Sequence, residues 1–492
     1  EISCSLVGSE MCIRDRFLLM LVMFAALACA ATSIQFFQAP SLNADGRNTR
    51  TILHAAEIDR GPIIVGGDAV ASSSKEEGSA RFQRYYSQGP LYAHVTGYFS
   101  SVFSQASGIE RASEDVLDGR SDALLMHRIR TLFTGSERQG GGVVLTLNEQ
   151  MQQVAAEALG SRKGAVVALD PKTGAVLALY SSPSYDPNPL ASFDAQTVQN
   201  AYDALVADPA QPLTNRAIAG NRYAPGSAFK ILTAAALLEN GMTPDTPVDS
   251  PVETPLPEST TTVSNIESTT CGNGKPALRE AFARSCNTSF VIASQQLPDT
   301  ALADMAERFQ FGTELSIPLT VTPSRYPEDA NAPERALTSI GQFDVQVTPM
   351  QMAMVAAAVG NHGVMMKPQL IREIVDADLQ STQQMTPTRL AEPISDGVAS
   401  QLTSMMVSTV NEPYGTGGLM ALSNWQVAAK TGTAETGDGS GKANAWAVAF
   451  APADDPQIAI AVLVEGDDEQ PVPHGGDTAG PIARAVMEAG LQ

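Results

Sequence analysis

A serine and a lysine stand three residues apart at the start of an apolar stretch. Ser227 is followed by Lys230 in the run SAFKILTAAALLENG. Residues three apart lie on one face of a helix, so the hydroxyl and the amine can meet. A lysine inside so apolar a helix must find a partner or lose its charge, and a neutral amine is a competent base. The spacing therefore predicts an activated serine nucleophile.

Two further short patterns follow along the chain. Ser285 and Asn287 form an S-x-N pattern that interrupts an apolar helical segment. A K-T-G-T run comprises Lys430, Thr431, Gly432 and Thr433. This run ends a predicted strand beside the apolar stretch NAWAVAF, so its side chains should line a sheet edge. The glycine would let a ligand approach the backbone closely.

Each pattern occurs twice, so context must decide between the copies. The other copies begin at Ser72, Ser41 and Lys172, in a polar run, beside an apolar N-terminal segment and in a Pro/Gly turn. For an isolated match, the simpler interpretation is a helix-capping serine and a solvated lysine, and a polar cap also explains the S-x-N pattern. The order S-x-x-K, S-x-N and K-T-G, on a predicted helix, loop and strand, favours the copies at 227, 285 and 430.

These three copies together strongly resemble the transpeptidase domain of penicillin-binding proteins, over about residues 142–492. The runs NRAIAGNRYAPGSAFK, LTSIGQFDVQVTPMQMAMVAAAVGNHGV and AWAVAFAPADDP support the resemblance. RGPI from Arg60 and the run GIERASEDVLDG are similar to the amino-terminal module of the class B, monofunctional members. The chain is most similar to the actinobacterial penicillin-binding protein A group.

The resemblance implies a peptidoglycan D,D-transpeptidase that cross-links stem peptides and is inhibited by β-lactams. Ser227 would be the nucleophile, Lys230 its base and Ser285 a proton relay to the leaving D-alanine. Asn287 and Lys430 would position that relay. The residues implied to bind substrate are Thr431, Gly432 and Thr433. No cofactor or metal is expected, because the five histidines show no ligand spacing.

Three other activities fit part of the pattern. A D,D-carboxypeptidase or a β-lactamase shares the site chemistry but is deacylated by water. A non-catalytic β-lactam sensor would need a cytoplasmic output domain, for which only residues before Phe17 are available. A bifunctional enzyme is disfavoured because residues 38–141 are too few for a glycosyltransferase.

The N-terminal region predicts export across a membrane. Residues 17–31 are continuously apolar and follow Arg14 and Arg16. An uncleaved anchor over residues 17–37 is favoured over a cleaved signal peptide, and lipidation at Cys29 is disfavoured. We expect a single-pass protein of the cell membrane with an extracytoplasmic catalytic domain. Residues 1–16 are interpreted as a non-native leader.

The remaining patterns predict an α/β chain of the α+β type. Residues 38–141 should form a small β-containing module, and residues 142–492 the transpeptidase domain. There, an antiparallel sheet should be covered by helices, because its last two strands are apolar on both faces. A helical lobe should follow the nucleophile.

Composition limits the partners. The net charge is −22, which disfavours nucleic acid, and 43% hydrophobic with 17% charged residues indicates globular structure. The resemblance implies stem peptides, β-lactams and cell-wall synthesis or division proteins as partners, and the apolar N-terminal segment implies the cytoplasmic membrane.

Two cysteines lie in the exported part. Cys286 stands between Ser285 and Asn287, so its side chain should point away from the substrate, and Cys271 is close upstream. We expect a disulfide between them; two independent buried thiols are the alternative.

Overall fold

The computed structural model describes residues 3–34, 56–125, 139–265, 268–437 and 439–492. The chain divides into two compact units, Glu1–Glu57 and Ile58–Gln492, which are considered separately.

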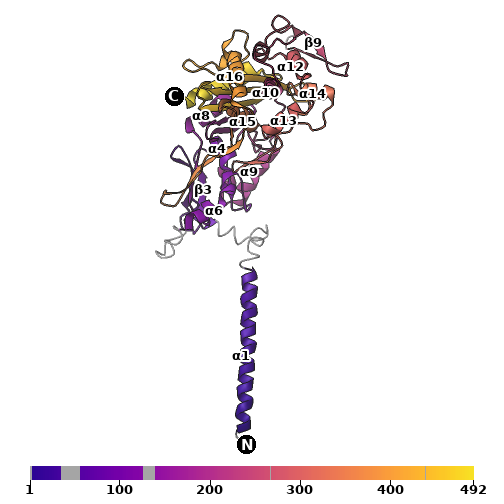
Figure 1. The fold of residues 1–492 in the computed structure, drawn as a ribbon. Coiled ribbons are helices and arrows are strands. Elements are labelled where there is room, and N and C mark those ends of the chain that lie inside the picture. Colours follow the sequence, from indigo (N-terminus) through magenta and orange to yellow (C-terminus); the bar gives the residue numbers. More distant parts are fainter. Residues whose placement is uncertain (1–2, 35–55, 126–138, 266–267, 438) are drawn as a thin grey trace. The chain divides into compact units, whose positions relative to one another are not determined.

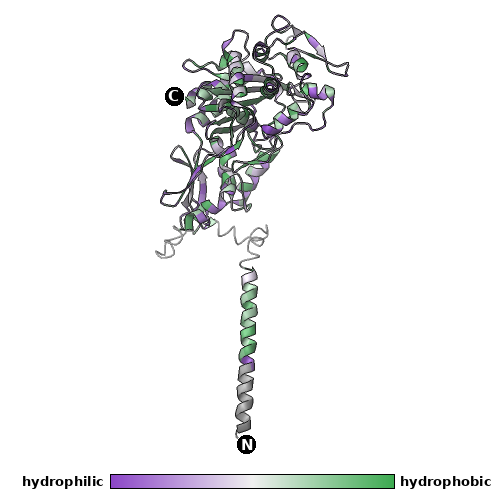
Figure 2. Ribbon diagram, viewed as in Figure 1, coloured by the Kyte–Doolittle hydropathy of each residue, from purple (hydrophilic) through white to green (hydrophobic). Residues whose placement is uncertain are grey.

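The first unit contains one long helix, α1 (Ser3–Thr32). Its segment Asp15–Thr32 is long and apolar enough to cross a membrane, although a signal sequence meets the same criterion. Large apolar side chains such as Phe24 are exposed along this segment, which Figure 2 shows as almost uniformly hydrophobic. The predicted anchor therefore begins inside α1, whereas its residues 35–37 lie outside the described residues. The predicted leader is helical from Ser3 onward.

The second unit is built around a five-stranded antiparallel sheet. Its strand order is β17-β18-β19-β7-β8, which leaves β17 at an edge. The bounds are β7 (Gly164–Leu169), β8 (Val176–Ser182), β17 (Ala428–Glu435), β18 (Ala443–Ala451) and β19 (Ile458–Glu465).

Helices cover both faces of this sheet, as the apolar strands predict. Successive side chains of a strand point to opposite faces, so one strand can serve two cores. In β18, Trp446, Val448 and Phe450 join the core that contains α10 (Lys230–Glu239), α15 (Pro349–Gly360) and α16 (Asp396–Asn411). The alternating alanines of β18 join a second core with α8 (Glu149–Leu159) and α17 (Gly480–Gly490).

A second sheet has six strands in the order β15-β14-β6-β1-β2-β3. The bounds are β1 (Ile63–Val65), β2 (Asp68–Lys75), β3 (Phe82–Tyr86), β6 (Gly142–Leu145), β14 (Ile371–Val375) and β15 (Ser381–Gln384). β6 pairs in parallel with β1 and antiparallel with β14. Residues on both sides of the predicted boundary at 141/142 therefore share one sheet.

Short helices form the lobe that follows Ser227 and α10 along the chain (Figure 1). They are α11 (Leu278–Ala283), α12 (Asn287–Ser294), α13 (Ala301–Arg308) and α14 (Ala332–Thr338). Within the described residues of this unit, the other α-helices are α4 (Gly89–Thr96), α5 (Gly108–Ala112), α6 (Glu114–Leu117) and α9 (Ala195–Ala207). Pairs of two- or three-residue strands complete the unit: β4 (Phe99–Ser100) with β5 (Gln105–Ala106), β9 (Glu253–Pro255) with β10 (Thr262–Ser264), β11 (Leu315–Ser316) with β12 (Thr320–Val321), and β13 (Met365–Met366) with β16 (Arg389–Ala391).

One buried carboxylate joins the two N-terminal motifs. Glu110 of α5 is fully buried and accepts hydrogen bonds from Arg60 at 3.0 Å and from Arg84 of β3 at 2.6 Å. Burial raises the pKa of Glu110, but the positive charges of Arg84 and Arg60 lower it by more. The pKa of this carboxyl is therefore below its ordinary value. The carboxylate thus stays ionised and ties the RGPI segment and β3 to α5.

We predict that Glu110→Gln destabilises this region by roughly 3 kcal/mol, because removing one partner leaves two arginines buried without a counter-charge. Denaturant unfolding of the full chain measures the loss. Glu114→Gln on neighbouring α6 is the control, since its pair with Arg120 is exposed and 3.9 Å long. Equal effects of the two substitutions would contradict the role of Glu110.

Candidate active site

The candidate nucleophile lies on a tight turn that leads into the core of the lobe. Ser227 is in the 3₁₀ helix η4 (Gly226–Phe229), and α10 begins directly afterwards at Lys230. The serine thus stands one short turn ahead of the α-helix that the sequence predicts it to open. Ser227 is 9% exposed and lines a cleft, whereas Lys230 is fully buried behind it.

Backbone and side-chain contacts hold this turn against the sheet. The indole of Trp446 donates a hydrogen bond to the carbonyl of Ala224 at 3.0 Å. A Cβ on Gly432 would lie 2.8 Å from the carbonyl oxygen of Pro225 and 3.0 Å from the Ala228 nitrogen. The glycine of the K-T-G run therefore lets the nucleophile turn pack onto β17. The sequence predicts a close approach at this glycine, but of a ligand rather than of the chain itself.

A polar cluster ties the preceding loop to the far end of β19. Glu465 accepts hydrogen bonds from Arg216 and from the hydroxyl of Tyr223, both at 2.8 Å. Sequence reasoning assigned no role to these residues. The buried guanidinium of Arg216 needs a counter-charge, which only the folded chain brings to it.

Lys230 reaches across to the S-x-N turn. Its Nζ donates to the carbonyl of Ser285 at 2.7 Å and to Oδ1 of Asn287 at 2.8 Å, and lies 3.5 Å from the Ser285 hydroxyl. It also lies over the ring of Phe290, 5.4 Å from the centroid. No hydrogen bond joins Lys230 to Ser227 in the described part of the chain.

Lys430 reaches the same hydroxyl from β17. Its Nζ donates to Oγ of Ser285 at 2.9 Å and to the carbonyl of Thr431 at 2.8 Å. The structure therefore brings both predicted lysines to Ser285, and one of them also to Asn287.

Both lysines have a depressed pKa. Burial is the main cause for Lys230, and the charge of Lys430 lowers its pKa further. Burial lowers the pKa of Lys430 to about 7. The site therefore holds two amines whose charged forms are disfavoured by burial and which can exchange protons through one serine hydroxyl.

Ser285 has a backbone conformation that serine rarely adopts. Its φ is +62°, at the end of α11. Its N–H bonds to the carbonyl of Phe282, and the next N–H, of Cys286, bonds to that of Ala281. This pattern is the Schellman motif, in which the left-handed position usually carries glycine. A serine here indicates that its hydroxyl is needed at the cost of backbone strain.

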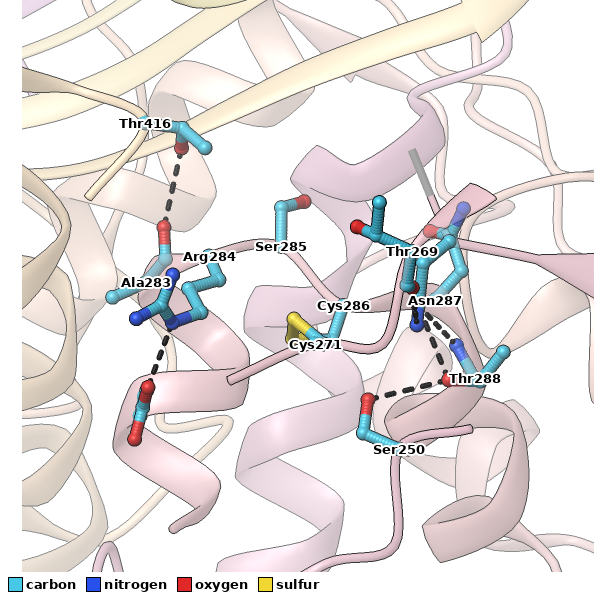
Figure 3. Close-up of a disulfide and its surroundings, with 12 residues drawn as sticks. Ser250, Thr269, Cys271, Ala283, Arg284, Ser285, Cys286, Asn287, Thr288 and Thr416 are labelled. Atoms are coloured by element: carbon cyan, nitrogen blue, oxygen red, sulfur yellow. Dashed lines mark hydrogen bonds and ion pairs between the residues drawn. A yellow bond between two sulfur atoms is a disulfide. The ribbon is translucent and has the colours of Figure 1, made fainter. Parts of the chain in front are cut away.

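A disulfide lies directly behind this turn. The structure joins Cys271 to Cys286, with their Cα atoms 5.9 Å apart. Figure 3 shows the sulfur atoms below the turn, on the side away from the Ser285 hydroxyl. The bond anchors the residue between Ser285 and Asn287 to the preceding loop.

The cleft in front of Ser227 has a volume of about 1130 Å³. Ser285, Asn287 and the run from Thr431 to Thr433 line it as well. A Cβ on Gly226 would meet the carbonyl oxygen of Thr433 at 2.5 Å, so this carbonyl faces the nucleophile turn, away from β18. The N–H and the C=O of one strand residue share a side, so the Thr433 N–H also faces outward from the sheet edge. It can serve as an oxyanion donor.

The other motif copies do not contribute to this cleft. Ser72 and Lys75 lie in β2, where Ser72 pairs with Tyr85. Lys172 forms an exposed ion pair with Asp455 at the β7–β8 turn. Ser41 and its motif lie outside the described residues. No group of three or more His, Cys, Asp or Glu side chains within the described ranges is arranged to hold a metal ion.

Comparison with known families agrees with this geometry. Residues 164–488 match the penicillin binding protein transpeptidase domain, and residues 60–143 match the penicillin binding protein A dimerisation domain. The chain belongs to the penicillin-binding protein family. The residues that the family resemblance singled out are thus part of a penicillin-binding transpeptidase fold.

Relatives in this family cover nearly the whole chain. The peptidoglycan D,D-transpeptidase PbpA of Mycolicibacterium smegmatis is 40% identical over 96% of this chain and 97% of its own length. The peptidoglycan D,D-transpeptidase MrdA of Acinetobacter baumannii is 30% identical over 82% of this chain and 65% of its own. A ceftriaxone acyl-enzyme complex of penicillin-binding protein A from M. tuberculosis superimposes with a TM-score of 0.85 at 39% identity, covering 89% of this chain and 100% of the other.

We predict that Ser285→Gly is more stable than Ser285→Ala by about 1 kcal/mol, because glycine adopts a positive φ without steric cost. Both variants lack the hydroxyl, so the comparison isolates the backbone. Unfolding midpoints under non-reducing conditions measure the difference. The same pair of substitutions at Ser404, exposed inside α16, should show the opposite order. A more stable alanine variant at Ser285 would refute the strain.

Proposed function

We propose that this chain is a peptidoglycan D,D-transpeptidase that cross-links stem peptides through an acyl-enzyme on Ser227. The observation that carries the proposal is the convergence of two buried lysines, both with lowered pKa, on the Ser285 hydroxyl beside an accessible serine. The names of the relatives and the acyl-enzyme structure support the same reaction.

Acylation begins with the Ser227 hydroxyl. Its oxygen bonds to the carbonyl carbon of the penultimate D-alanine, and its proton passes to the neutral amine of Lys230. The tetrahedral intermediate then collapses, and the bond to the terminal D-alanine breaks. The departing nitrogen takes a proton from Ser285, which Lys230 reprotonates. Lys430 holds the Ser285 hydroxyl in place throughout.

Backbone groups stabilise the charge that develops on the carbonyl oxygen. The N–H groups of Ser227 and Thr433 form the oxyanion hole, where one donor is typically worth about 3 kcal/mol. Thr431 and Thr433 hold the terminal carboxylate of the substrate. Gly432 keeps β17 close enough to the nucleophile turn for this arrangement.

An amine from a neighbouring strand then attacks the acyl-enzyme carbonyl and loses a proton to Lys230. The bond to Ser227 breaks, the serine oxygen takes that proton from Lys230, and the cross-link is complete. A carboxypeptidase or a β-lactamase would use water instead and needs a base to activate it. Among the described residues, neither lysine nor Ser285 is hydrogen-bonded to a carboxylate. The relatives named D,D-transpeptidase favour transfer to an amine, and we expect a long-lived penicilloyl adduct.

The apolar helix α1 and the disulfide support a placement of the chain in the cell. Residues 17–37 anchor the chain in the cytoplasmic membrane. The module 38–141 and the transpeptidase domain 142–492 lie outside the cytoplasm. Cell-wall synthesis or division proteins are their partners. The apolar α1 supports the anchor. The disulfide supports an oxidising compartment.

Labelling with a fluorescent penicillin tests the nucleophile. Ser227→Ala should lose the label completely while keeping its unfolding midpoint, and Lys230→Ala should lose it almost as completely, because an unactivated hydroxyl is a weak nucleophile. Ser72→Ala, in the polar copy of the motif, is the control and should label like the unsubstituted chain. Label mapped to any residue other than Ser227, or rapid release of the bound drug, would refute the proposal.

Acylation should slow as the pH is lowered, with a rate limb well below the pH at which an ordinary lysine titrates, because a protonated Lys230 cannot accept the serine proton. Burial lowers the pKa of this lysine, so its neutral form persists to lower pH than that of an exposed lysine and is lost on the acidic side. The second-order acylation rate measured from pH 5 to 9 tests this, with spontaneous hydrolysis of the probe as the control. A rate limb near pH 10, where an ordinary lysine titrates, would show that the lysine is not perturbed.

A further inference from the structure

Thr416 links the two halves of the site. It lies in the segment NEPYGTGGLM, after α16. Its hydroxyl is 2.6 Å from the hydroxyl of Thr431, the threonine of the K-T-G run. Its hydroxyl and its N–H both reach the carbonyl of Ala283, at 3.3 and 3.2 Å, as Figure 3 shows for the hydroxyl.

The Thr416 hydroxyl carries one hydrogen, which it can donate either to the carbonyl of Ala283 or to the hydroxyl of Thr431. The 3.3 Å contact is long for a hydroxyl donor, whereas 2.6 Å is the distance of a strong hydrogen bond. The carbonyl of Ala283 keeps the Thr416 N–H as a donor in either case. Turning the hydroxyl towards Thr431 therefore leaves no acceptor unsatisfied.

The direction of this bond decides how Thr431 meets an anion. If Thr431 donates to Thr416, its lone pairs face the cleft and repel a carboxylate. If Thr416 donates, the Thr431 hydroxyl is free to donate into the cleft that it lines. Among the described residues, Thr416 is the one hydrogen-bond partner of the Thr431 hydroxyl.

Glycines on both sides hold Thr416 in this place. A Cβ on Gly415 would lie 2.2 Å from the carbonyl oxygen of Thr409, and the N–H of Gly417 donates to that same oxygen at 2.9 Å. The segment is thus packed against the end of α16, and no Cβ fits at Gly415 without a shift of the backbone.

We propose that Thr416 is a positioning residue that donates its hydroxyl proton to Thr431 and thereby makes Thr431 a donor to the carboxylate of the bound substrate. The inference rests on the proposed function, because it assigns the carboxylate to Thr431. Thr416 itself does not touch the reacting atoms. It acts on recognition of the anion and not on the nucleophile.

The test compares acylation by benzylpenicillin, which carries a carboxylate, with acylation by its methyl ester, which does not. Thr416→Val keeps the shape and removes the proton. It should slow acylation by benzylpenicillin roughly tenfold, the effect of one charge-assisted hydrogen bond. The rate with the ester should change less than about twofold. Thr416→Ser should restore the carboxylate preference.

A double substitution shows whether Thr416 acts through Thr431. Adding Thr416→Val to Thr431→Val should cause no further loss with benzylpenicillin. Thr403→Val is the matched control, because this hydroxyl, also in α16, donates to the Ala399 carbonyl at 2.9 Å and Thr403 does not line the cleft. It should leave both rates unchanged. Should Thr416→Val fail to fold, Thr416→Ala gives the same comparison.

Two results would overturn the inference. Equal slowing of both probes by Thr416→Val would mean that Thr416 only braces the loop, and unchanged rates with both would mean that its proton is not needed. Failure of the unsubstituted chain to be acylated at Ser227 would instead overturn the proposed function, and this inference with it.

Discussion

Two buried lysine side chains share one serine hydroxyl at the edge of the cleft. Lys230 and Lys430 are both fully buried, and the structure supplies acceptors for them through the carbonyls of Ser285 and Thr431. Desolvation of an ammonium group is costly, and two such groups side by side also repel each other. The lowered pKa values of both lysines follow from this placement. Burial thus favours the neutral, proton-accepting form of each amine.

This constraint explains the shape of the surrounding elements. The three groups come from α10, from the turn before α12 and from β17, so those elements must meet with their backbones close together. Gly432 permits that contact on one side. On the other side, Ser285 takes a left-handed conformation inside a Schellman motif, and the bond between Cys271 and Cys286 holds the turn from behind. Strain at the relay residue is therefore balanced by local cross-links.

The N-terminal module is joined to the same framework by backbone pairing. β1 pairs with β6, and β6 pairs with β14, which follows α15. α15 packs under the five-stranded sheet that carries Lys430. The module and the catalytic sheet are thus connected through strands and a helix, and the buried Glu110 fixes the module's own motifs in place.

The sequence by itself determined the chemistry and the order of the elements. Short motifs encode side-chain types at fixed spacings, and the apolar runs on both faces of β18 and β19 predict helices on either side of the sheet. A sequence cannot say which lysine contacts which acceptor, because those contacts join residues 55 and 145 positions apart. Nor could it show that the boundary at 141/142 crosses a sheet, that Gly432 makes room for the chain itself, or that Thr416 lies beside Thr431. These facts depend on distances between segments remote in sequence, which only packing of the whole unit sets.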